Sequence, residues 1–322
     1  MRLSRVAFAC AVLIASGAAQ AQAPYPNRTI RMIVPLAAAS AVDNAARIVT
    51  QKMAENMGQQ IVILNQPGAS GLIGAGEVAR SAPDGYTLGG FNDSIMTMVP
   101  NLQAKMPWDI VRDFEPVSLV ATVEWGLVTA SSSPWKTAAD LIAAAKAAPG
   151  KIDYASGGIG SPQHLAMALF ASKTDISLTH VPYRGATQAA GDVAAGQVPV
   201  CFQGLATVAG LLQGGQLKLL GVTTKERLPE FPNAPTVSES GLPGFTFESW
   251  FAVMAPAGTP KPIIDKLHAE IVRAVADPGV RDKLRVQGLT VRASSPDELR
   301  DALRVQLAKY ADVIRDAGIK PE

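Results

Sequence analysis

The chain has 322 residues, of which 48% are hydrophobic and 17% are charged. This composition is typical of a folded globular protein and excludes an intrinsically disordered one. The formal net charge is only +2 and there is no basic run, which argues against nucleic acid as a partner.

Residues 1–21 have the pattern of an export signal. Arg2 and Arg5 precede a short apolar stretch, which runs into a small-x-small cleavage site ending at Ala21. We therefore expect a periplasmic protein, cleaved near Ala21. Loss of two arginines from 29 basic residues leaves 27 against 27 acidic ones, so the mature chain is formally neutral. Cys201 is then the only cysteine, which leaves no internal disulfide to hold the fold together.

Strand-like and helix-like patterns alternate after the leader. The first strand is expected at residues 29–34. Ser40 and Asp43 then have the spacing of a helix-capping pair, and Gly58 is placed to end that helix. Further strands are expected at residues 60–65 and 86–91.

The alternation continues in the second half of the chain. Thr137 and Asp140 repeat the capping spacing, and the helix that they open stops before Pro149. Apolar runs predict strands at residues 152–156, 176–181, 198–202 and 217–222, and the pattern after Pro260 is nearly all helical. We expect an α/β protein with mostly parallel sheets flanked by helices.

Two long apolar runs, residues 115–130 and 248–258, are long enough to cross from one lobe of the protein to another. They predict one lobe made of residues 22–124 and 246–322, with a second lobe, residues 125–245, inserted in it. Ligands of open α/β sheets bind where loops leave the carboxyl ends of the strands. Here those loops are rich in Gly, Ser, Ala and amides, which let backbone N–H groups approach a ligand closely.

The stretch "HVPYRGATQAAG" combines a turn, a cation and the start of a helix. The helix is expected to begin near Ala186, so Arg184 and the free N–H groups of its first turn would lie together. Both favour an anion, and a carboxylate is the simplest one to suit them. Tyr183 either forms a wall of the pocket or covers the sheet edge.

Other functions fit the sequence less well. The glycines from Gly68 to Gly76 lack the dinucleotide-binding spacing. A hydrolase using Ser156 or Ser161 with His164 remains an alternative, although the G-x-S-x-G motif is absent. The His, Cys and acid positions have no metal-ligand spacing. We expect no enzymatic activity, no catalytic or metal-binding residue and no cofactor.

Several motifs together resemble the solute-binding receptors of tripartite tricarboxylate transporters, the Bug or TctC family. They occur in the family's order and cover essentially the whole mature chain: "IRMIVPL", "ILNQPGASGLIGA", "APDGYTL", "DFEPVSLVA", "YASGGIGSPQHLA", "HVPYRGATQA", "NAPTVSESGLPGF", "WFAVMAPAGTP" and "AGIK".

The resemblance implies a two-lobe periplasmic-binding-protein fold of type II, the Venus flytrap. Such a receptor captures a dicarboxylate, tricarboxylate or aromatic carboxylate between its lobes and delivers it to a membrane permease of two subunits. We expect a monomer. The ligand-binding residues implied by the resemblance are Leu36, Ala37, Ala38, Ala39, Ser70, Ser94, Ser156, Gly158, Ser161, Arg184, Gly185, Ala186 and Gln203.

Two positions depart from the family pattern. Residues 37–40 read Ala-Ala-Ala-Ser where the family usually has Pro-Pro-Gly-Gly, and the extra Cβ atoms restrict the backbone of this loop. Gln203 stands where many members carry Asp, which favours an anionic or neutral polar second end on the ligand over an ammonium. A sensor that presents its closed form to a membrane kinase would use the same cleft, and the sequence does not separate that function from transport.

Overall fold

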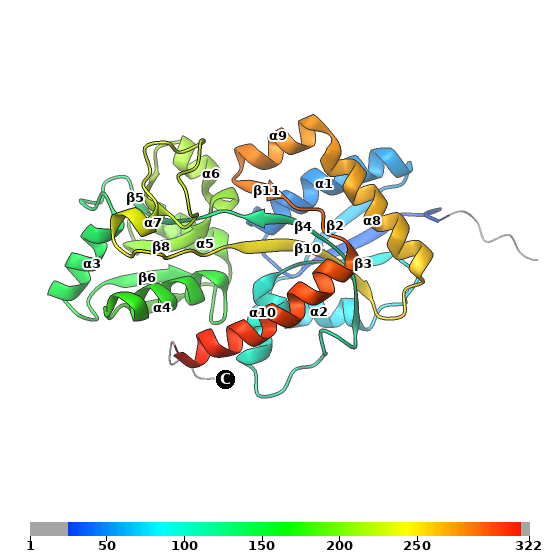
Figure 1. Ribbon diagram of the computed structural model, residues 1–322, viewed down its shortest axis with the longest axis horizontal. Coiled ribbons are helices and arrows are strands. Elements are labelled where there is room, and N and C mark those ends of the chain that lie inside the picture. Colours follow the sequence, from blue (N-terminus) through cyan, green and yellow to red (C-terminus); the bar gives the residue numbers. More distant parts are fainter. Residues whose placement is uncertain (1–24, 317–322) are drawn as a thin grey trace, which may run out of the picture.

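The computed structural model describes residues 25–316 and contains two β-sheets, each flanked by helices (Figure 1). The expected leader, residues 1–21, lies outside the described residues. The α/β class expected from the alternating pattern is confirmed. Because Figure 1 shows the two sheets side by side along the long axis, each sheet with its helices is called a lobe below.

The first lobe surrounds a six-stranded sheet, sheet A. In spatial order its strands are β11 (Leu289–Val291), β4 (Phe114–Val123), β10 (Ser249–Pro256), β3 (Thr87–Asn92), β1 (Ile30–Val34) and β2 (Ile61–Asn65). Its helices are α1 (Ala41–Met57), α2 (Leu72–Ala79), α8 (Lys261–Ala276), α9 (Pro278–Val286) and α10 (Pro296–Asp316), with short helical turns η1 (Ala69–Gly71), η2 (Ser94–Met98) and η3 (Val99–Asn101).

The second lobe surrounds a five-stranded sheet, sheet B. Its strands are β7 (Thr179–Pro182), β6 (Asp153–Ser156), β8 (Val200–Gly204), β5 (Trp125–Ala130) and β9 (Leu217–Val222). Its helices are α3 (Ala138–Ala147), α4 (Pro162–Thr174), α5 (Ala186–Ala194), α6 (Leu205–Gln213) and α7 (Val237–Ser240).

The sheets are mixed, which corrects the expectation of mostly parallel strands. Of the nine strand pairings among the described residues, only four are parallel: β1 with β2 and β3, and β6 with β7 and β8. The five antiparallel pairings all involve β4, β5 or β10. These strands belong to the long apolar runs, whose partners are distant in sequence, so the local β–α–β pattern could not reveal their direction.

The chain crosses between the sheets twice, and at the first crossing a single residue separates the two strands. β4 ends in sheet A at Val123, Glu124 follows, and Trp125 begins β5 in sheet B. The chain returns to sheet A when β10 begins at Ser249 (Figure 1). We therefore propose residues 125–245 as one lobe, and residues 22–124 with 246–322 as the other.

The core of the first lobe follows the alternation of side chains along β10. Phe251 and Val253 pack in a cluster with residues of α1 and α8, whereas Trp250 and Ala252 pack on the other face with residues of α2 and α10. All eight residues of β10 are buried. A central strand covered on both faces must be apolar throughout, which explains the continuous hydrophobic run.

Local signals set the helix ends. The Ser40 side chain accepts the N–H of Asp43 at the start of α1, and Gly58 ends that helix in the left-handed conformation at φ 66°. Thr137 and Asp140 form the complete reciprocal capping box of α3. Both expected helix starts are thereby confirmed.

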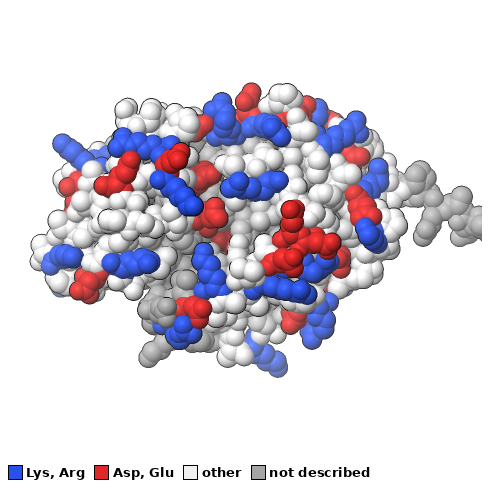
Figure 2. All heavy atoms as spheres, in the orientation of Figure 1, with Lys and Arg blue, Asp and Glu red and all other residues white. Residues whose placement is uncertain are grey.

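Basic and acidic side chains are interspersed over the face shown in Figure 2. Within residues 25–316, no helix combines the length and apolar character needed to cross a membrane.

Candidate functional site

A cavity of about 610 Å³ lies between the two lobes. Three loops of sheet A reach it, at the carboxyl ends of β1, β2 and β3, and three loops of sheet B reach it, at the ends of β6, β7 and β8. These are the six loops that the sequence pattern singled out. The volume is in the range of cavities that hold small organic molecules.

Nine of the thirteen residues predicted to bind ligand line this cavity: Leu36, Ala37, Ser70, Ser94, Gly158, Ser161, Arg184, Gly185 and Ala186. Ala38, Ala39, Ser156 and Gln203 are not among the lining residues. Ser156 and Gln203 instead form hydrogen bonds to the lining residues Gly158, Gln163 and Ala186.

Ser156 is buried beneath the loop that follows β6. Its Oγ lies 2.6 Å from His180 Nε2 and accepts the N–H of Gly158 at 3.1 Å. His180 in turn stacks on His164, with ring centroids 4.3 Å apart. Ser156 therefore supports the Gly158 loop from below and does not face the cavity.

The arrangement of these serines does not resemble a hydrolase site. His164 Nδ1 accepts the N–H of Gly160, and Ser161 caps α4 by accepting the N–H of His164. Ser156 contacts His180 rather than His164. Because Ser156 is also fully buried, its hydroxyl is not placed to attack a substrate in the cavity.

The loop after β1 is held by Asp43 at the start of α1. The Asp43 carboxylate accepts the N–H of Ala39 and the side chains of Arg47 and Asn65. Burial acts to raise the pKa of Asp43, but these hydrogen bonds outweigh it and hold the pKa below its usual value. Ala39 is kept at φ 59°, a conformation that glycine adopts more readily.

Hydrogen bonds join the lobes on two sides of the cavity. On one side, Ser94 Oγ donates to the carbonyl of Gly160 at 2.8 Å, and Ser70 Oγ donates to that of Ile159 at 3.1 Å. On the other side, Thr187 Oγ1 donates to Ala38 O, Ala41 N–H donates to Thr207 Oγ1, and Asn44 Nδ2 donates to Ala206 O. These bonds hold the lobes together around the cavity.

The anion-favouring end of the cavity lies at the start of α5. The N–H groups of its first turn have no intrahelical partners, as in any α-helix, and here no side chain caps them either. Arg184 precedes the helix, and its guanidinium has no hydrogen bond or ion pair to any residue in the described part of the chain. It is also the only charged residue among those that line the cavity. The adjacent Tyr183 lines the cavity and donates its hydroxyl to Asp192.

Gly185 lies where the two lobes meet, and close approach rather than backbone conformation explains the glycine. Its φ of 179° is extended backbone that any residue adopts, so the turn itself does not need glycine. A Cβ at this position would lie 3.0 Å from the Cβ of Ala37 in the other lobe. Gly185 therefore allows the lobes to approach closely.

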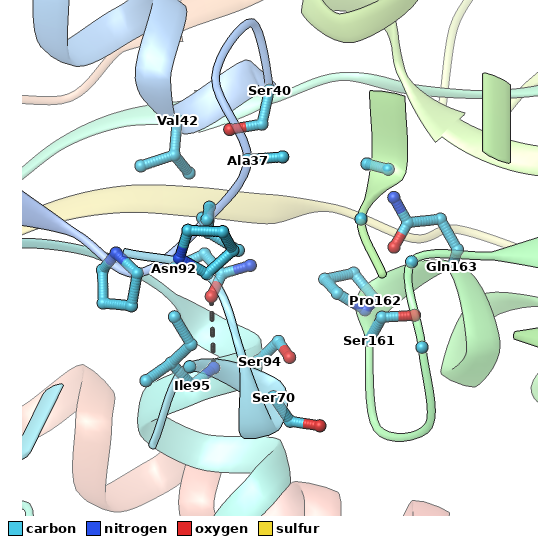
Figure 3. A pocket seen from close by; sticks show the side chains of 18 of the residues that line it. Ala37, Ser40, Val42, Ser70, Asn92, Ser94, Ile95, Ser161, Pro162 and Gln163 are labelled. Atoms are coloured by element: carbon cyan, nitrogen blue, oxygen red, sulfur yellow. Dashed lines mark hydrogen bonds between the residues drawn. The ribbon is translucent and has the colours of Figure 1, made fainter. Parts of the chain in front are cut away.

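Sequence reasoning missed several lining residues. Asn92 directly follows the strand expected at residues 86–91, and Gln163 lies in the motif "YASGGIGSPQHLA", but only the small residues beside them, Ser94 and Ser161, were predicted to bind ligand. Other lining residues give the cavity apolar walls: Val42, Ile95, Val123, Trp125 and Ile159. All of these except Ile159 are buried, and a buried hydrophobic position carries no local signal that it faces a cavity. Figure 3 shows Val42 and Ile95 on one side, facing Pro162 and Gln163 on the other.

Two lobes, six strand-end loops and a small-molecule cavity between them define the class of binding proteins that enclose a solute between α/β lobes. Residues 45–319 match the family model described as the tripartite tricarboxylate transporter family receptor. The chain belongs to this family, as the sequence motifs indicated, and the solved structures that it resembles are periplasmic binding proteins.

Individual relatives agree over nearly their full length. A protein encoded in the tcbD–tcbE intergenic region of Pseudomonas sp. (strain P51) is 36% identical, with 95% of this chain and 91% of that protein covered. The structure of R. palustris Rpa4515 with adipate superposes with a TM-score of 0.90 at 33% identity, covering 92% of this chain and 100% of the other. MatC from Rhodopseudomonas palustris with bound malate has a TM-score of 0.85 at 30% identity, covering 90% and 100%.

Proposed function

We propose that this protein is an extracytoplasmic receptor that captures a small carboxylate-containing solute between its lobes for a tripartite tricarboxylate transporter. The observation that carries the proposal is the unpaired cation Arg184 beside the uncapped start of α5, both at the cavity. No acidic residue is among the lining residues. A carboxylate there would receive a charge-assisted hydrogen bond, worth about 1.5–3 kcal/mol, together with backbone N–H groups.

The titles of the related structures support the same chemical class. Rpa4515 is described with adipate and MatC with malate, and both chains are similar to this one along almost their whole length. The cavity adds apolar walls, including Val42, Ile95 and Trp125, against which the body of a ligand would pack. Dicarboxylates, tricarboxylates and aromatic carboxylates all belong to the proposed class.

Calorimetric titration of organic acids and amino acids tests the binding function. At least one acid should bind tightly. Arg184→Gln should weaken that binding about tenfold or more, because it removes the positive charge while keeping a planar group with N–H donors. Arg28→Gln is the matched control, since Arg28 pairs with Asp84 away from the cavity. Binding of only a cationic amine, or equal affinities for wild type and Arg184→Gln, would contradict the proposal.

The transport role has its own test. Deletion of the gene should abolish uptake of the solute identified by calorimetry. Normal uptake with loss of a transcriptional response to the same solute would instead indicate a sensor. Native mass spectrometry of the freshly purified protein would identify a copurified solute and so supply the first acid to test.

A further inference from the structure

Two amide side chains at the cavity have orientations fixed by the backbone. The first is Gln163, whose orientation is set by its contact with Gln203, a fully buried residue of β8. Gln203 Nε2 donates to the carbonyl of Ala186 at 3.0 Å. Because a carbonyl can only accept, this end of Gln203 must be its NH₂ group. Gln203 Oε1 is then an acceptor, and it receives Gln163 Nε2 at 3.2 Å.

This relay determines what Gln163 presents to the cavity. One N–H of its NH₂ group donates to Gln203, which fixes that end as the nitrogen, and no hydrogen bond within the described chain reaches its Oε1. Gln163 is only 4% exposed and lines the cavity, and Figure 3 shows it on the sheet B side. Because Gln163 lines the cavity, this acceptor is open to a donor group of a bound ligand.

Asn92 presents the opposite polarity from the other lobe. Its Oδ1 accepts the backbone N–H of Ile95 at 3.1 Å, and a backbone N–H can only donate. The remaining Nδ2 is therefore a donor, and it has no partner among residues 25–316. Asn92 is 5% exposed and lines the cavity. In Figure 3 this nitrogen points away from Ile95, toward the lobe that carries Gln163.

A donor on one wall and an acceptor on the other suit a group that both accepts and donates. An ionised carboxylate would be repelled by Gln163 Oε1, because neither oxygen carries a proton. An ammonium would bring a positive charge into a cavity whose lining residues include Arg184 and no acid. A neutral primary carboxamide offers an N–H to Gln163 Oε1 and an oxygen to Asn92 Nδ2 without a charge.

We propose that the carboxylate ligand of this receptor also carries a neutral primary carboxamide, which Gln163 and Asn92 recognise together. The inference rests on the proposed function, since it assigns the second end of the same ligand. Gln203 acts here as a positioning residue. It does not reach the cavity, but it fixes which end of Gln163 does.

Matched ligands on common scaffolds test the inference. The aliphatic set is the monoamide of adipic acid, adipate, and 6-oxoheptanoate, whose methyl ketone has the shape of the amide but no donor. The aromatic set is 4-carbamoylbenzoate, terephthalate and 4-acetylbenzoate. In the set that binds, calorimetry should give the amide an affinity about tenfold or more above both the ketone and the dicarboxylate, because only the amide pairs with Gln163.

Variants show which residues make the receptor prefer the amide to the ketone. Gln163→Met keeps the length of the side chain and removes the acceptor, so amide and ketone should bind it within about threefold of each other. Gln203→Met should also reduce the discrimination, because Gln163 is then free to turn its amide. Gln51→Met, an exposed position on α1, is the control and should leave the discrimination unchanged.

The outcomes separate this inference from the proposed function. Equal affinities for amide and ketone in the wild type, or a preference for the dicarboxylate or for an amine analogue, would overturn the inference while carboxylate binding stands. Failure of every acid in both sets and in the wider panel would overturn both. Should Gln163→Met not fold, the wild-type ligand series decides by itself.

Discussion

The Asp93 carboxylate accepts a 2.5 Å hydrogen bond from Ser249 Oγ, which joins the end of β3 to the start of β10, and Ser249 itself lines the cavity. Asp93 is fully buried, and the hydroxyl of Tyr310 on α10 approaches its second oxygen at 3.4 Å. Its neighbours Asn92 and Ser94 both line the cavity. Burial raises the pKa of Asp93 to about 7, although hydrogen bonds from Ser249, Ser94 and Tyr310 act to lower it.

Asp93 should make the protein less stable as the pH rises toward neutrality. The native carboxyl keeps its proton up to about pH 7, whereas the unfolded chain releases it near pH 3.9. The contribution of Asp93 to stability is therefore complete below about pH 3.9 and is lost as the pH rises to about 7. Asp93→Asn removes this loss and should gain about 2–4 kcal/mol relative to wild type between pH 4 and pH 8. Thermal melts across this range measure the difference. Asp265→Asn, at an exposed ion pair, should show no such trend, and parallel curves for Asp93→Asn and wild type would refute the assignment.

His164 should have the opposite dependence in acid. Burial and the neighbouring His180 lower the pKa of His164 to about 4, so the native imidazole stays neutral while the unfolded one becomes charged below about pH 6.5. Stability is therefore complete above pH 6.5 and falls toward about pH 4. His164→Asn keeps an acceptor for the Gly160 N–H and should reduce this fall. Chemical denaturation at several pH values measures it, with His268→Asn as control, and an unchanged acid profile in His164→Asn would count against the prediction.

Gly185→Asp should weaken ligand binding about tenfold or more without unfolding the protein. Its side chain would start 3.0 Å from the Cβ of Ala37 and would place a negative charge beside the start of α5. Gly191→Asp adds the same charge on the same helix, where a Cβ meets nothing within 4 Å. Calorimetry and circular dichroism on both variants check this. A dissociation constant in Gly185→Asp equal to that of Gly191→Asp would argue against the site.

Ala39→Gly should stabilise the protein by about 1 kcal/mol, because it removes the steric cost of a left-handed alanine. The position belongs to the loop after β1, where the Asp43 carboxylate holds the Ala39 N–H at 2.8 Å. Ala54→Gly, in the interior of α1, should have the opposite effect and lower stability by a similar amount. Denaturant unfolding of both variants gives the comparison. Destabilisation by Ala39→Gly would show that the loop depends on its methyl group.

Local chemistry made much of the fold predictable. Apolar runs located β1, β2 and β9 to within a residue at each end, and side-chain caps located the starts of α1 and α3. Strand direction was not predictable where it depends on partners far along the chain. β10, for example, pairs with β3 and β4 although more than one hundred residues separate it from either.

The cavity was predictable as a set of loops but not as a set of side chains. Strand ends followed by small residues pointed to the correct six loops, because ligands of open α/β sheets bind at the carboxyl ends of the strands. Whether Asn92 and Gln163 present a donor or an acceptor to the cavity depends on the partner that holds the opposite atom of each side-chain amide. Gln203, for instance, lies forty positions from Gln163, and sequence spacing gives no sign of their contact.

The position of β10 also constrains the order in which the chain can fold. Sheet A has no link between β3 and β4 until residues 249–256 exist, because β10 alone lies between them. Sheet B is encoded by one uninterrupted stretch, from β5 to β9. During synthesis, sheet A therefore cannot be completed until the carboxyl-terminal quarter of the chain has been made. The first lobe stays incomplete until late in synthesis, in a chain that is similar to periplasmic proteins. In refolding of the complete chain, the long sequence separation between β10 and its partners β3 and β4 favours the same order. Pulsed hydrogen exchange should therefore show amides of β6 and β8 protected before those of β3 and β4.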